Sequence, residues 1–451
     1  MHKFTAPLSL ALIGLLAVGC TLANERGAAN HSALRHAENT GAIFSGDTLE
    51  PYALAFRAYV WGMPLVEWAK VRIFKTRPET PFSARLAHNG GAAINRFGAA
   101  RELYGPDSTD GVGPNNDTLY SIASFDTSDG PFVIETPDFG KRYYTFTVYM
   151  ADTVSHQSPG QRTHGGQLPP MFLYGPDYHG EVPKDMLALA ADTRYVMIAG
   201  RFLVDGSTDD LARVHALQDR IRVRTFAAYS AGLDEAPPVS EQHIPGRGQY
   251  EDDPALHFMA QLGDLLRDWH LRDSETALVA SLTPIGLSVD RGFDASALSA
   301  AELEPIRRGL ADASALVAER SHQLGVQVKG WTINYSGADF GGDYLLRAAV
   351  AKDQTGVSIA EEAIYPSGRE DSDGNPLDGQ YQYRIVIPKA ELPPVDAFWS
   401  ITLYDDRGIM VHNPINRYSI GDRTPGLAVA DDGSITIALQ HQRPEDPLLN
   451  W

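Results

Sequence analysis

Residues 144–162 read YTFTVYMADTVSHQSPGQR, and a similar pattern returns 255 positions later as WSITLYDDRGIMVHNPINR at residues 399–417. Both segments begin with the two-residue alternation of a β-strand that buries one face. Each then runs through nine residues to a proline, which is followed three positions later by an arginine. The repeat predicts two copies of one β module, each built as a sandwich that buries one face of each sheet.

The alternation in the first copy indicates which strand face is buried. The apolar set is Tyr144, Phe146 and Val148, and the opposite set is Thr145, Thr147 and Tyr149. Segments of similar composition, bounded by Asp, Gly and Pro, predict further strands. They are residues 117–126, 131–138, 194–204, 380–389 and 434–441.

Other segments have the period of helices. These helices are expected at residues 48–74, 211–232, 253–271 and 303–324. Pro64 is expected to end or kink the first one. Ser207 is a predicted N-cap of the second, and Ser299 with Glu302 forms a capping box before the last.

Strands and helices therefore occur in separate runs, which predicts an α+β fold, mainly β, rather than an alternating parallel sheet. Two β-sandwich modules are expected to be joined by a helical middle. The predicted parts are a lipoprotein signal peptide at 1–19, a tether at 20–46, an N-terminal helical segment at 47–105, the first β module at 106–205, the helical middle at 206–325 and the second β module at 326–451.

The N-terminus has the features of an export signal. Lys3 gives a positive start, and the mostly apolar run over residues 4–17 is shorter than the ~20 residues of a membrane-spanning helix. Small residues then lead into Cys20, the single cysteine of the 451 residues. This resembles the bacterial lipobox, in which the cysteine is lipidated and becomes the first mature residue, and Thr21 after it favours the outer membrane. The alternative is an ordinary signal cut after residue 23, which discards Cys20.

The composition limits the classes of partner and chemistry. The chain has 38 Lys and Arg against 57 Asp and Glu, a formal net charge of −19. This balance argues against nucleic acid as a partner, because phosphate binding needs a basic face. A chain whose single cysteine is a lipidation site has no disulfide, no thiol nucleophile and no cysteine-based metal site.

Several long strings resemble a pair of families, the domains of unknown function numbered 1254 (N-terminal) and 1214 (C-terminal). The strings that resemble the first are residues 113–153 and 200–219. Those that resemble the second are residues 343–351, 373–389, 391–408, 413–424 and 432–440. The resemblance implies two jelly-roll-like β sandwiches surrounded by helices, and it implies no established chemistry.

The end of the chain departs from this resemblance. Members of the second family continue past an Asn-Trp pair through a Leu-Pro-x-Pro stretch and a final strand, whereas the sequence stops at Asn450 and Trp451. The resemblance therefore implies either an open sheet edge in the second module or a truncated gene product.

Two polar loops are candidate ligand sites at the mouths of the predicted sandwiches. The candidates in the first loop, GPNNDTLY, are Asn115, Asn116 and Tyr120. Those in the second loop, NPINRYSIGDR, are Asn413, Asn416, Arg417 and Tyr418. Because Asn and Asp side chains also satisfy turn backbone, both loops have a purely structural interpretation as well.

The catalytic candidates are Asp117, Arg142, Tyr144 and Arg162, placed in a cleft between the first β module and the helices. This hypothesis makes the protein an enzyme, for example a hydrolase. The sequence contains no G-x-S-x-G elbow, no P-loop and no G-x-G-x-x-G at a strand–helix junction, so serine hydrolase, NTPase and dinucleotide chemistry lose support. No cofactor is predicted.

Metal binding has only weak sequence support. The calcium candidates are Asp371, Asp373, Asn375 and Asp378. Their loop lacks the glycine and the glutamate that an EF-hand needs at its sixth and twelfth positions, so a hairpin turn is favoured. His156, His164 and His179 do not have the spacing of a zinc site.

The sequence as a whole predicts an outer-membrane lipoprotein that faces the periplasm and binds a small polar ligand or an envelope component. Its predicted partners are the membrane, through the lipid anchor, and a small molecule, but not nucleic acid. A soluble periplasmic or secreted protein is the alternative location. An enzyme and a structural scaffold are the alternative functions.

Overall fold

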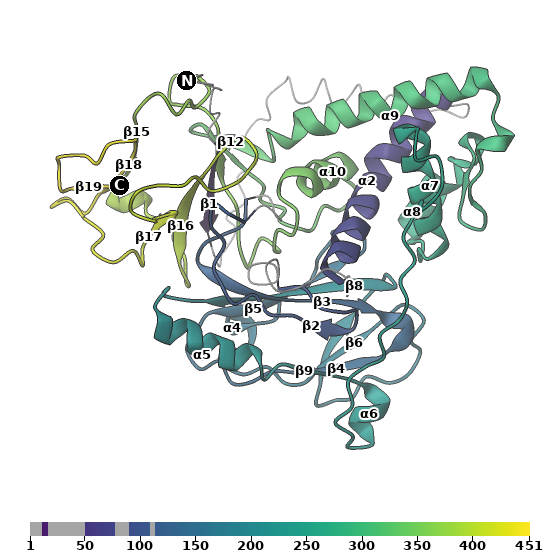
Figure 1. The fold of residues 1–451 in the computed structure, drawn as a ribbon, viewed down its shortest axis with the longest axis horizontal. Coiled ribbons are helices and arrows are strands. Elements are labelled where there is room, and N and C mark those ends of the chain that lie inside the picture. The colour runs from purple at the N-terminus through teal and green to yellow at the C-terminus, as the bar shows by residue number, and fades with distance from the viewer. Residues whose placement is uncertain (1–10, 17–49, 77–89, 109–112) are drawn as a thin grey trace, which may run out of the picture.

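The computed structural model describes residues 11–16, 50–76, 90–108 and 113–451 (Figure 1). Cys20, the predicted tether and part of the N-terminal helical segment lie outside the described residues. The α+β class is confirmed, with sheets and helices in separate layers.

The first β module is a sandwich of two four-stranded sheets. One sheet has the order β2 (Arg96–Phe97), β3 (Thr118–Asp126), β8 (Tyr195–Leu203) and β5 (Tyr144–Met150). The other has the order β7 (Leu187–Ala190), β6 (Met171–Tyr174), β4 (Phe132–Glu135) and β9 (Arg222–Thr225). All pairs are antiparallel except β6 with β7, and the predicted strands of this module are confirmed.

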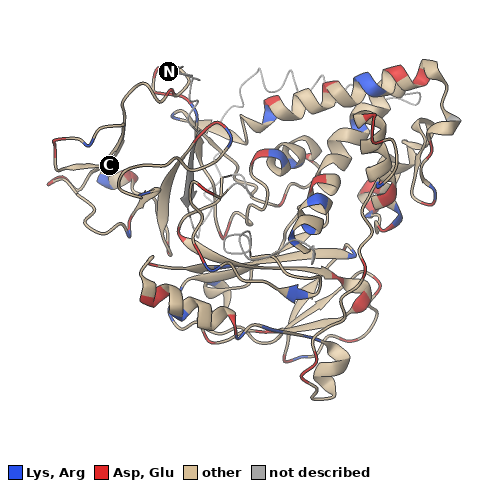
Figure 2. Cartoon of the chain, viewed as in Figure 1, with Lys and Arg blue, Asp and Glu red and all other residues tan. Residues whose placement is uncertain are grey.

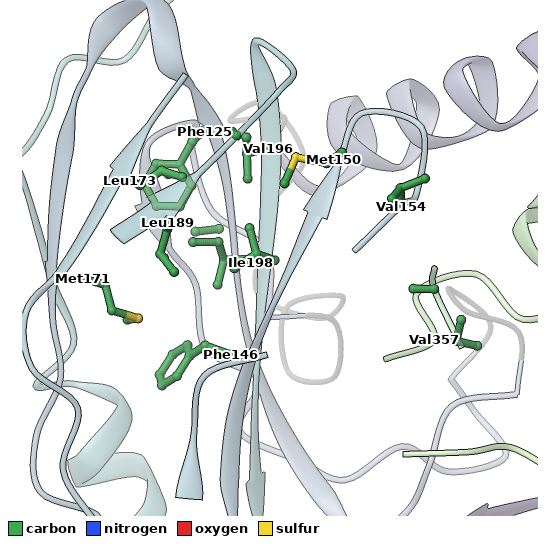
Figure 3. Packing of buried hydrophobic residues seen from close by; sticks show 14 of the residues in the cluster. Phe125, Phe146, Met150, Val154, Met171, Leu173, Leu189, Val196, Ile198 and Val357 are labelled. Atoms are coloured by element: carbon green, nitrogen blue, oxygen red, sulfur yellow. The ribbon is translucent and has the colours of Figure 1, made fainter. Parts of the chain in front are cut away.

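The inner faces of these two sheets form the largest apolar core of the described chain (Figure 3). Phe146 and Ile198 of one sheet lie opposite Met171 and Leu173 of the other. Tyr144, Phe146 and Val148 are all 0% exposed, which confirms the predicted buried face of β5. Burial of such a side chain stabilises the fold by ~1.5–3 kcal/mol.

The long helix predicted over 211–232 is wrong. Helix α5 (Thr208–Gln218) ends early, β9 follows, and a short α6 (Phe226–Ser230) comes after it. The reason is tertiary: Val223 pairs with Ile134 of β4 and packs on the core, and this contact outweighs local helix propensity. The Ser207 cap is confirmed, since its hydroxyl accepts from the Asp210 N–H at 3.3 Å.

A layer of helices covers the outer face of the β3–β8–β5 sheet (Figure 1). It contains α2 (Pro51–Thr76), α7 (Pro254–Arg267), α8 (Asp273–Ala280), α9 (Ala300–Ser321) and α10 (Tyr344–Asp353). Helix α2 runs through Pro64, so the expected end at this residue is wrong; burial of its neighbours Trp61 and Leu65 offsets a proline cost of ~3 kcal/mol. The capping box of Ser299 and Glu302 is confirmed.

The second β module pairs a six-stranded sheet with a three-stranded one. The larger sheet has the order β12 (Val326–Val328), β13 (Trp331–Ile333), β14 (Ser367–Gly368), β1 (Ala11–Leu16), β16 (Trp399–Tyr404) and β17 (Ser419–Gly421). The smaller has the order β15 (Tyr383–Ile387), β18 (Ile435–Leu439) and β19 (Leu449–Asn450). Trp399 and Ile420 of the larger sheet pack on Ile435 and Ile437 of the smaller sheet, so this module is also a sandwich.

Strand β1 comes from the segment that the sequence assigns to an export signal. It pairs antiparallel with β16 over six residues and with β14 over two, and it joins the two halves of the larger sheet. Cleavage before Cys20 would take this strand out of the sheet. No helix in the described part of the chain has both the length and the apolar character that a membrane crossing requires.

The two sequence repeats both form strands, and in both the chain returns along its own strand. Val148 bridges Gln157 after β5, and Tyr404 bridges Met410 after β16. The two strands differ in position, because β5 ends its sheet whereas β16 lies inside one. The repeats therefore share a local structure and take different places in their sandwiches.

Candidate functional site

The outer face of the β3–β8–β5 sheet carries a row of polar side chains that includes a charged residue. Tyr120, Arg201 and Thr145 are direct neighbours across the three strands. The next row along the strands is Ile122, Ala199 and Thr147. Strand alternation sends these side chains away from the sandwich core and toward the covering segments.

Arg201 is held by the chain that follows α10. Its Nη1 donates to the Tyr365 hydroxyl at 2.7 Å, and its Nη2 donates to the Gly356 carbonyl at 2.7 Å. The same carbonyl accepts from the Tyr149 hydroxyl at 2.7 Å. The guanidinium carbon lies 5.6 Å from the centre of the Tyr120 ring, within cation–π distance. We call Tyr120, Tyr143, Tyr149, Arg201 and Tyr365 the Arg201 site.

The positive charge of this site is not neutralised by any carboxylate among the described residues. Burial lowers the pKa of Arg201, but the surrounding phenol oxygens, that of Tyr365 first, raise it well above the ordinary value. Burial also raises the pKa of Tyr120, and it raises that of Tyr149 to about 12. The guanidinium is therefore charged at pH 7, and the phenols of Tyr120 and Tyr149 are neutral.

Part of the Arg201 site is open to solvent. Tyr120, Tyr143, Arg201 and Tyr365 keep partial exposure, whereas Tyr149 is buried. Beside Arg201, a chain of buried hydroxyls runs from Thr145 through Ser158 to Thr147, at distances of 2.8 and 2.7 Å. The site thus combines a half-buried arginine with neutral hydrogen-bonding groups, an arrangement suited to a small anion.

Glu362 fixes the edge of the site nearest the second module. Its carboxylate is buried and accepts from the Tyr143 hydroxyl at 2.7 Å and from Arg162 Nε at 2.8 Å. Burial, followed by the nearby Glu362 charge, raises the pKa of Tyr143 well above its ordinary value. Tyr143 is therefore a neutral donor that holds the segment carrying Tyr365 against the sheet.

The first predicted loop reaches the site through one of its four residues. Tyr120 belongs to the Arg201 site, and its hydroxyl accepts from Asn115 Nδ2. Asn115 Oδ1 otherwise accepts from the N–H groups of Asp117 and Thr118 at the start of β3, and Asn116 Nδ2 donates to the Tyr104 carbonyl. Asp117 accepts from Ser400 Oγ at 2.7 Å and from Arg423 Nη2 at 3.2 Å, so it joins the two β modules.

The four catalytic candidates lie in separate environments. Asp117 lies at the junction of the two modules, and Arg142 makes a two-point ion pair with Asp210, with distances of 2.6 and 3.0 Å. The Tyr144 ring lies in the sandwich core, and its hydroxyl donates to the Gly165 carbonyl. Arg162 shares the Glu362 carboxylate with Tyr143 of the Arg201 site.

The second predicted loop borders a groove of about 630 Å³ between the sheets of the second module. Asn413, Arg417 and Tyr418 line it together with apolar residues of β16 and β18. The Asn413 amide bonds its own turn, and Arg417 Nη1 donates to the Trp451 carbonyl at 2.7 Å. Asn416 adopts φ +49°, a left-handed conformation that Asn tolerates in turns.

The residues proposed for calcium form a turn. Asp371 accepts from the N–H groups of Asp373 and Asn375, and Asp378 accepts from Gln380. Among the residues with described positions, no group of three or more His, Cys, Asp or Glu side chains is placed to hold a metal ion. The carboxylates of this loop are used by its own backbone.

Sequence reasoning missed Arg201, Glu362 and Tyr365. One signal was present, because Arg201 is the single charged residue inside the apolar strand segment 195–203. A charged side chain within such a segment needs a partner or a function. The contributions of Glu362 and Tyr365 depend on a chain crossing that local sequence does not encode.

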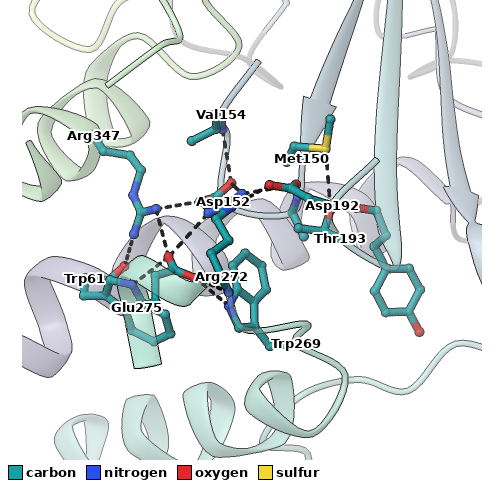
Figure 4. A network of polar contacts seen from close by, with 12 residues as sticks. Trp61, Met150, Asp152, Val154, Asp192, Thr193, Trp269, Arg272, Glu275 and Arg347 are labelled. Carbon is teal, nitrogen blue, oxygen red and sulfur yellow. Dashed lines mark hydrogen bonds and ion pairs between the residues drawn. The ribbon is translucent and has the colours of Figure 1, made fainter. Parts of the chain in front are cut away.

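A second arginine cluster joins the helical layer to the first sandwich (Figure 4). Asp152 is 0% exposed and accepts from Arg347 at 2.5 Å and from Arg272 at 2.7 Å. Arg272 also pairs with Asp192 at 2.6 Å and Glu275 at 3.3 Å. We call these five residues the Asp152 network.

The structure resembles one solved protein over most of its length. It matches the crystal structure of the VPA0106 protein from Vibrio parahaemolyticus with a TM-score of 0.61 and 20% identity, over 89% of this chain and 91% of that one. A weaker match, with a TM-score of 0.31 and 12% identity, is to an uncharacterised protein from Burkholderia cenocepacia, over 89% of this chain and 90% of that one. No curated protein matches the chain.

Two family models match separate parts of the sequence. The model described as a protein of unknown function (DUF1254) matches residues 94–225, which span the first sandwich. The model described as a protein of unknown function (DUF1214) matches residues 362–451, which span most of the second. The predicted resemblance is confirmed: the chain carries a DUF1254 region followed by a DUF1214 region.

Proposed function

We propose that the protein binds a small anionic molecule, such as a carboxylate, at the Arg201 site. The carrying observation is a half-buried arginine whose guanidinium has phenols and a carbonyl for neighbours and no carboxylate among the described residues. An enclosed cation without a counter-charge is unfavourable in the free protein. A bound anion would supply that charge.

The surroundings of Arg201 support a small ligand with polar groups rather than a macromolecule. Tyr120 is partly exposed and protonated at pH 7, and its hydroxyl accepts from Asn115, so its own proton can be donated to a ligand oxygen. A charge-assisted contact to Arg201 would give affinity, and the Tyr120 phenol would fix the orientation. Because the chain has a net charge of −19, a local positive charge would attract anions to this site rather than to the rest of the surface.

A thermal-shift titration with acetate, benzoate and succinate tests this function. At about 100 times its Kd a ligand adds ~2.7 kcal/mol to the free energy of unfolding. We expect at least one of the three to raise the midpoint of the wild type, Arg201→Gln to abolish that shift, and Arg201→Lys to keep part of it. Arg384→Gln, an exposed change on β15, is the charge-matched control.

Equal shifts in the wild type and Arg201→Gln would contradict the proposed function, and so would no shift in the wild type with any of the three acids. Circular dichroism of each variant confirms that it is folded before the comparison is made. Arg201→Lys covers the case in which Arg201→Gln does not fold.

We further propose that the protein works in the cell envelope, tethered through Cys20. The support is the apolar run and the small residues before this cysteine. Intact mass of the membrane-extracted protein is expected to show a chain that begins at Cys20 and carries acyl groups. A chain that begins at residue 24 without lipid would contradict the anchor and leave the Arg201 site untouched.

A further inference from the structure

We infer that a basic depression at the junction of the two modules binds phosphate groups. The depression has a volume of about 660 Å³. Its basic side chains are Lys141, Arg142, Arg213, Arg220 and Arg423. The first two precede β5, the next two lie on or just after α5, and Arg423 comes from the second module.

The depression carries excess positive charge although the chain is acidic. Its lining holds five basic side chains and two carboxylates, those of Asp205 and Asp210. Asp117, the ion-pair partner of Arg423, adds a third carboxylate, so the five basic side chains exceed the carboxylates by two charges. Elsewhere the signs are mixed, as along α9 in Figure 2. A local positive field of this kind selects anions.

The two carboxylates of the depression are already used. Asp210 is held by Arg142 at 2.6 Å, and the hydrogen bonds from Arg142 lower its pKa to about 2. Asp205 accepts from the N–H and the hydroxyl of Ser207, and these bonds lower its pKa. Both carboxylates are therefore ionised at pH 7 and committed to partners inside the protein.

Two of the cations are free to meet a ligand. Lys141 and Arg220 are exposed, and neither makes an ion pair with any residue that the structure describes. Two other arginines are fixed by backbone carbonyls. Arg142 donates to the Leu203 carbonyl at 2.5 Å, and Arg423 donates to the Val204 carbonyl at 3.0 Å. Fixed guanidiniums beside exposed, unpaired cations suit a doubly charged group with several oxygens, which is the chemistry of a phosphate ester.

The depression also has apolar and aromatic lining residues. Phe139, Tyr143 and Leu203 line it together with the basic side chains. This composition favours a ligand that joins phosphate to a ring or chain, whether a soluble phosphate ester or the headgroup of a lipid. The depression shares Tyr143 with the Arg201 site, but Arg201 itself does not line it, so variants at Lys141 and Arg220 test the depression apart from the proposed function.

Titration calorimetry with inorganic pyrophosphate tests the inference on the chain with Cys20→Ser. The test variant is Lys141→Ala with Arg220→Ala, two exposed changes that break no contact within the described chain. The matched control removes two other exposed cations, by Lys184→Ala with Arg384→Ala. We expect pyrophosphate to bind the wild type and the control equally, and the test variant at least tenfold more weakly, equal to ~1.4 kcal/mol.

A second arm separates the two sources of phosphate. Phosphatidylcholine vesicles with and without phosphatidic acid are sedimented with each protein. Loss of phosphatidic-acid binding in the test variant assigns the site to a lipid headgroup, and pyrophosphate binding without vesicle binding assigns it to a soluble ester. The inference is overturned if neither pyrophosphate nor vesicles bind, or if the test variant matches the control. Arg201→Gln is expected to bind pyrophosphate as the wild type does.

Discussion

Arg347 on α10 and Arg201 on β8 are both enclosed by the fold, and their surroundings differ in one respect. Arg347 meets the buried carboxylate of Asp152 at 2.5 Å and the Trp61 carbonyl at 2.7 Å. Arg201 meets a phenol and a carbonyl at similar distances. The first cation is neutralised by the protein itself, and the second is not neutralised by any described residue.

This difference distinguishes a structural ion pair from a candidate site. In the Asp152 network, every charge has a partner on another element, so the network fixes α8 and α10 against the loop after β5. At the Arg201 site, the arginine is partly exposed, and no described carboxylate neutralises its charge. An anion can add to the second cluster, whereas it would have to displace a carboxylate in the first.

The largest expected effect is in the Asp152 network. Asp152→Ala should lower the free energy of unfolding by ~3–5 kcal/mol, because it leaves two enclosed guanidiniums without their shared partner. Urea unfolding measures this as a lower midpoint with little change in slope. Asp192→Ala is the control: its side chain is 42% exposed, and we expect a loss of ~1 kcal/mol or less. Equal losses would mean that burial does not set the strength of this network.

A smaller effect on stability is expected at Arg201. Arg201→Gln loses two hydrogen bonds, each with a net contribution of ~0.5–1.5 kcal/mol, but it also removes an enclosed charge. We expect a net change of ~1 kcal/mol or less, measured by urea unfolding without ligand. A loss as large as that of Asp152→Ala would show that Arg201 is a structural residue, which would undo the comparison.

The pH dependence of stability should have opposite signs at two carboxylates. Burial raises the pKa of Asp117, despite the opposing bonds from Ser400 and Arg423, so the folded state takes up this proton more readily than the unfolded chain. As pH falls from 7 through the raised pKa, the contribution of Asp117 to stability therefore improves. Burial also opposes ionisation of Asp152, but the charges of Arg347 and Arg272 lower its pKa. Its contribution is present above about pH 4 and is lost as pH falls further.

Unfolding of the wild type and Asp117→Asn in urea at several pH values between 7 and 4 measures the first of these contributions. We expect the wild type to gain stability relative to the variant as the pH falls, since Asn cannot bind the proton. Asp152 stays ionised between pH 7 and 4, so it does not contribute to the measured change in stability. A relative loss of stability would show that Arg423 and Ser400 outweigh burial.

The smallest effect is expected for Tyr365→Phe. This change removes the hydroxyl that accepts from Arg201 and keeps the ring and the charge. We expect less than ~1 kcal/mol of lost stability and a retained midpoint shift with the carboxylate that binds the wild type. Complete loss of that shift, with a normal circular dichroism spectrum, would assign the binding to the phenol instead of the guanidinium.

The sequence predicted local structure well where alternation and capping are strong. Phe146 with its neighbours marked a buried strand, and Ser299 with Glu302 marked a helix start, and both predictions are confirmed. Prediction from the sequence failed where a tertiary contact overrides the local preference for helix or strand. Residues 222–225 form β9 because they complete the sheet beside β4, and α2 continues through Pro64 because both sides of the helix are packed.

The Arg201 site could be predicted only in part. Tyr120 was a ligand candidate, and Asn115 bonds its hydroxyl. Arg201 and Tyr365 are 164 positions apart and meet only because the chain after α10 crosses the outer face of the sheet. No local pattern encodes that crossing. The Asn-rich turns attracted notice instead, and the amides of Asn115 and Asn413 serve the backbone of their own turns.

A crystal of the wild-type protein soaked in bromide tests the central claim most directly, because anomalous scattering locates each bound anion. We predict a bromide peak within hydrogen-bonding distance of the Arg201 guanidinium, and no such peak at Arg347. A carboxylate of the chain paired with Arg201, or density that leaves Arg201 without any anion while Arg347 attracts one, would contradict the account.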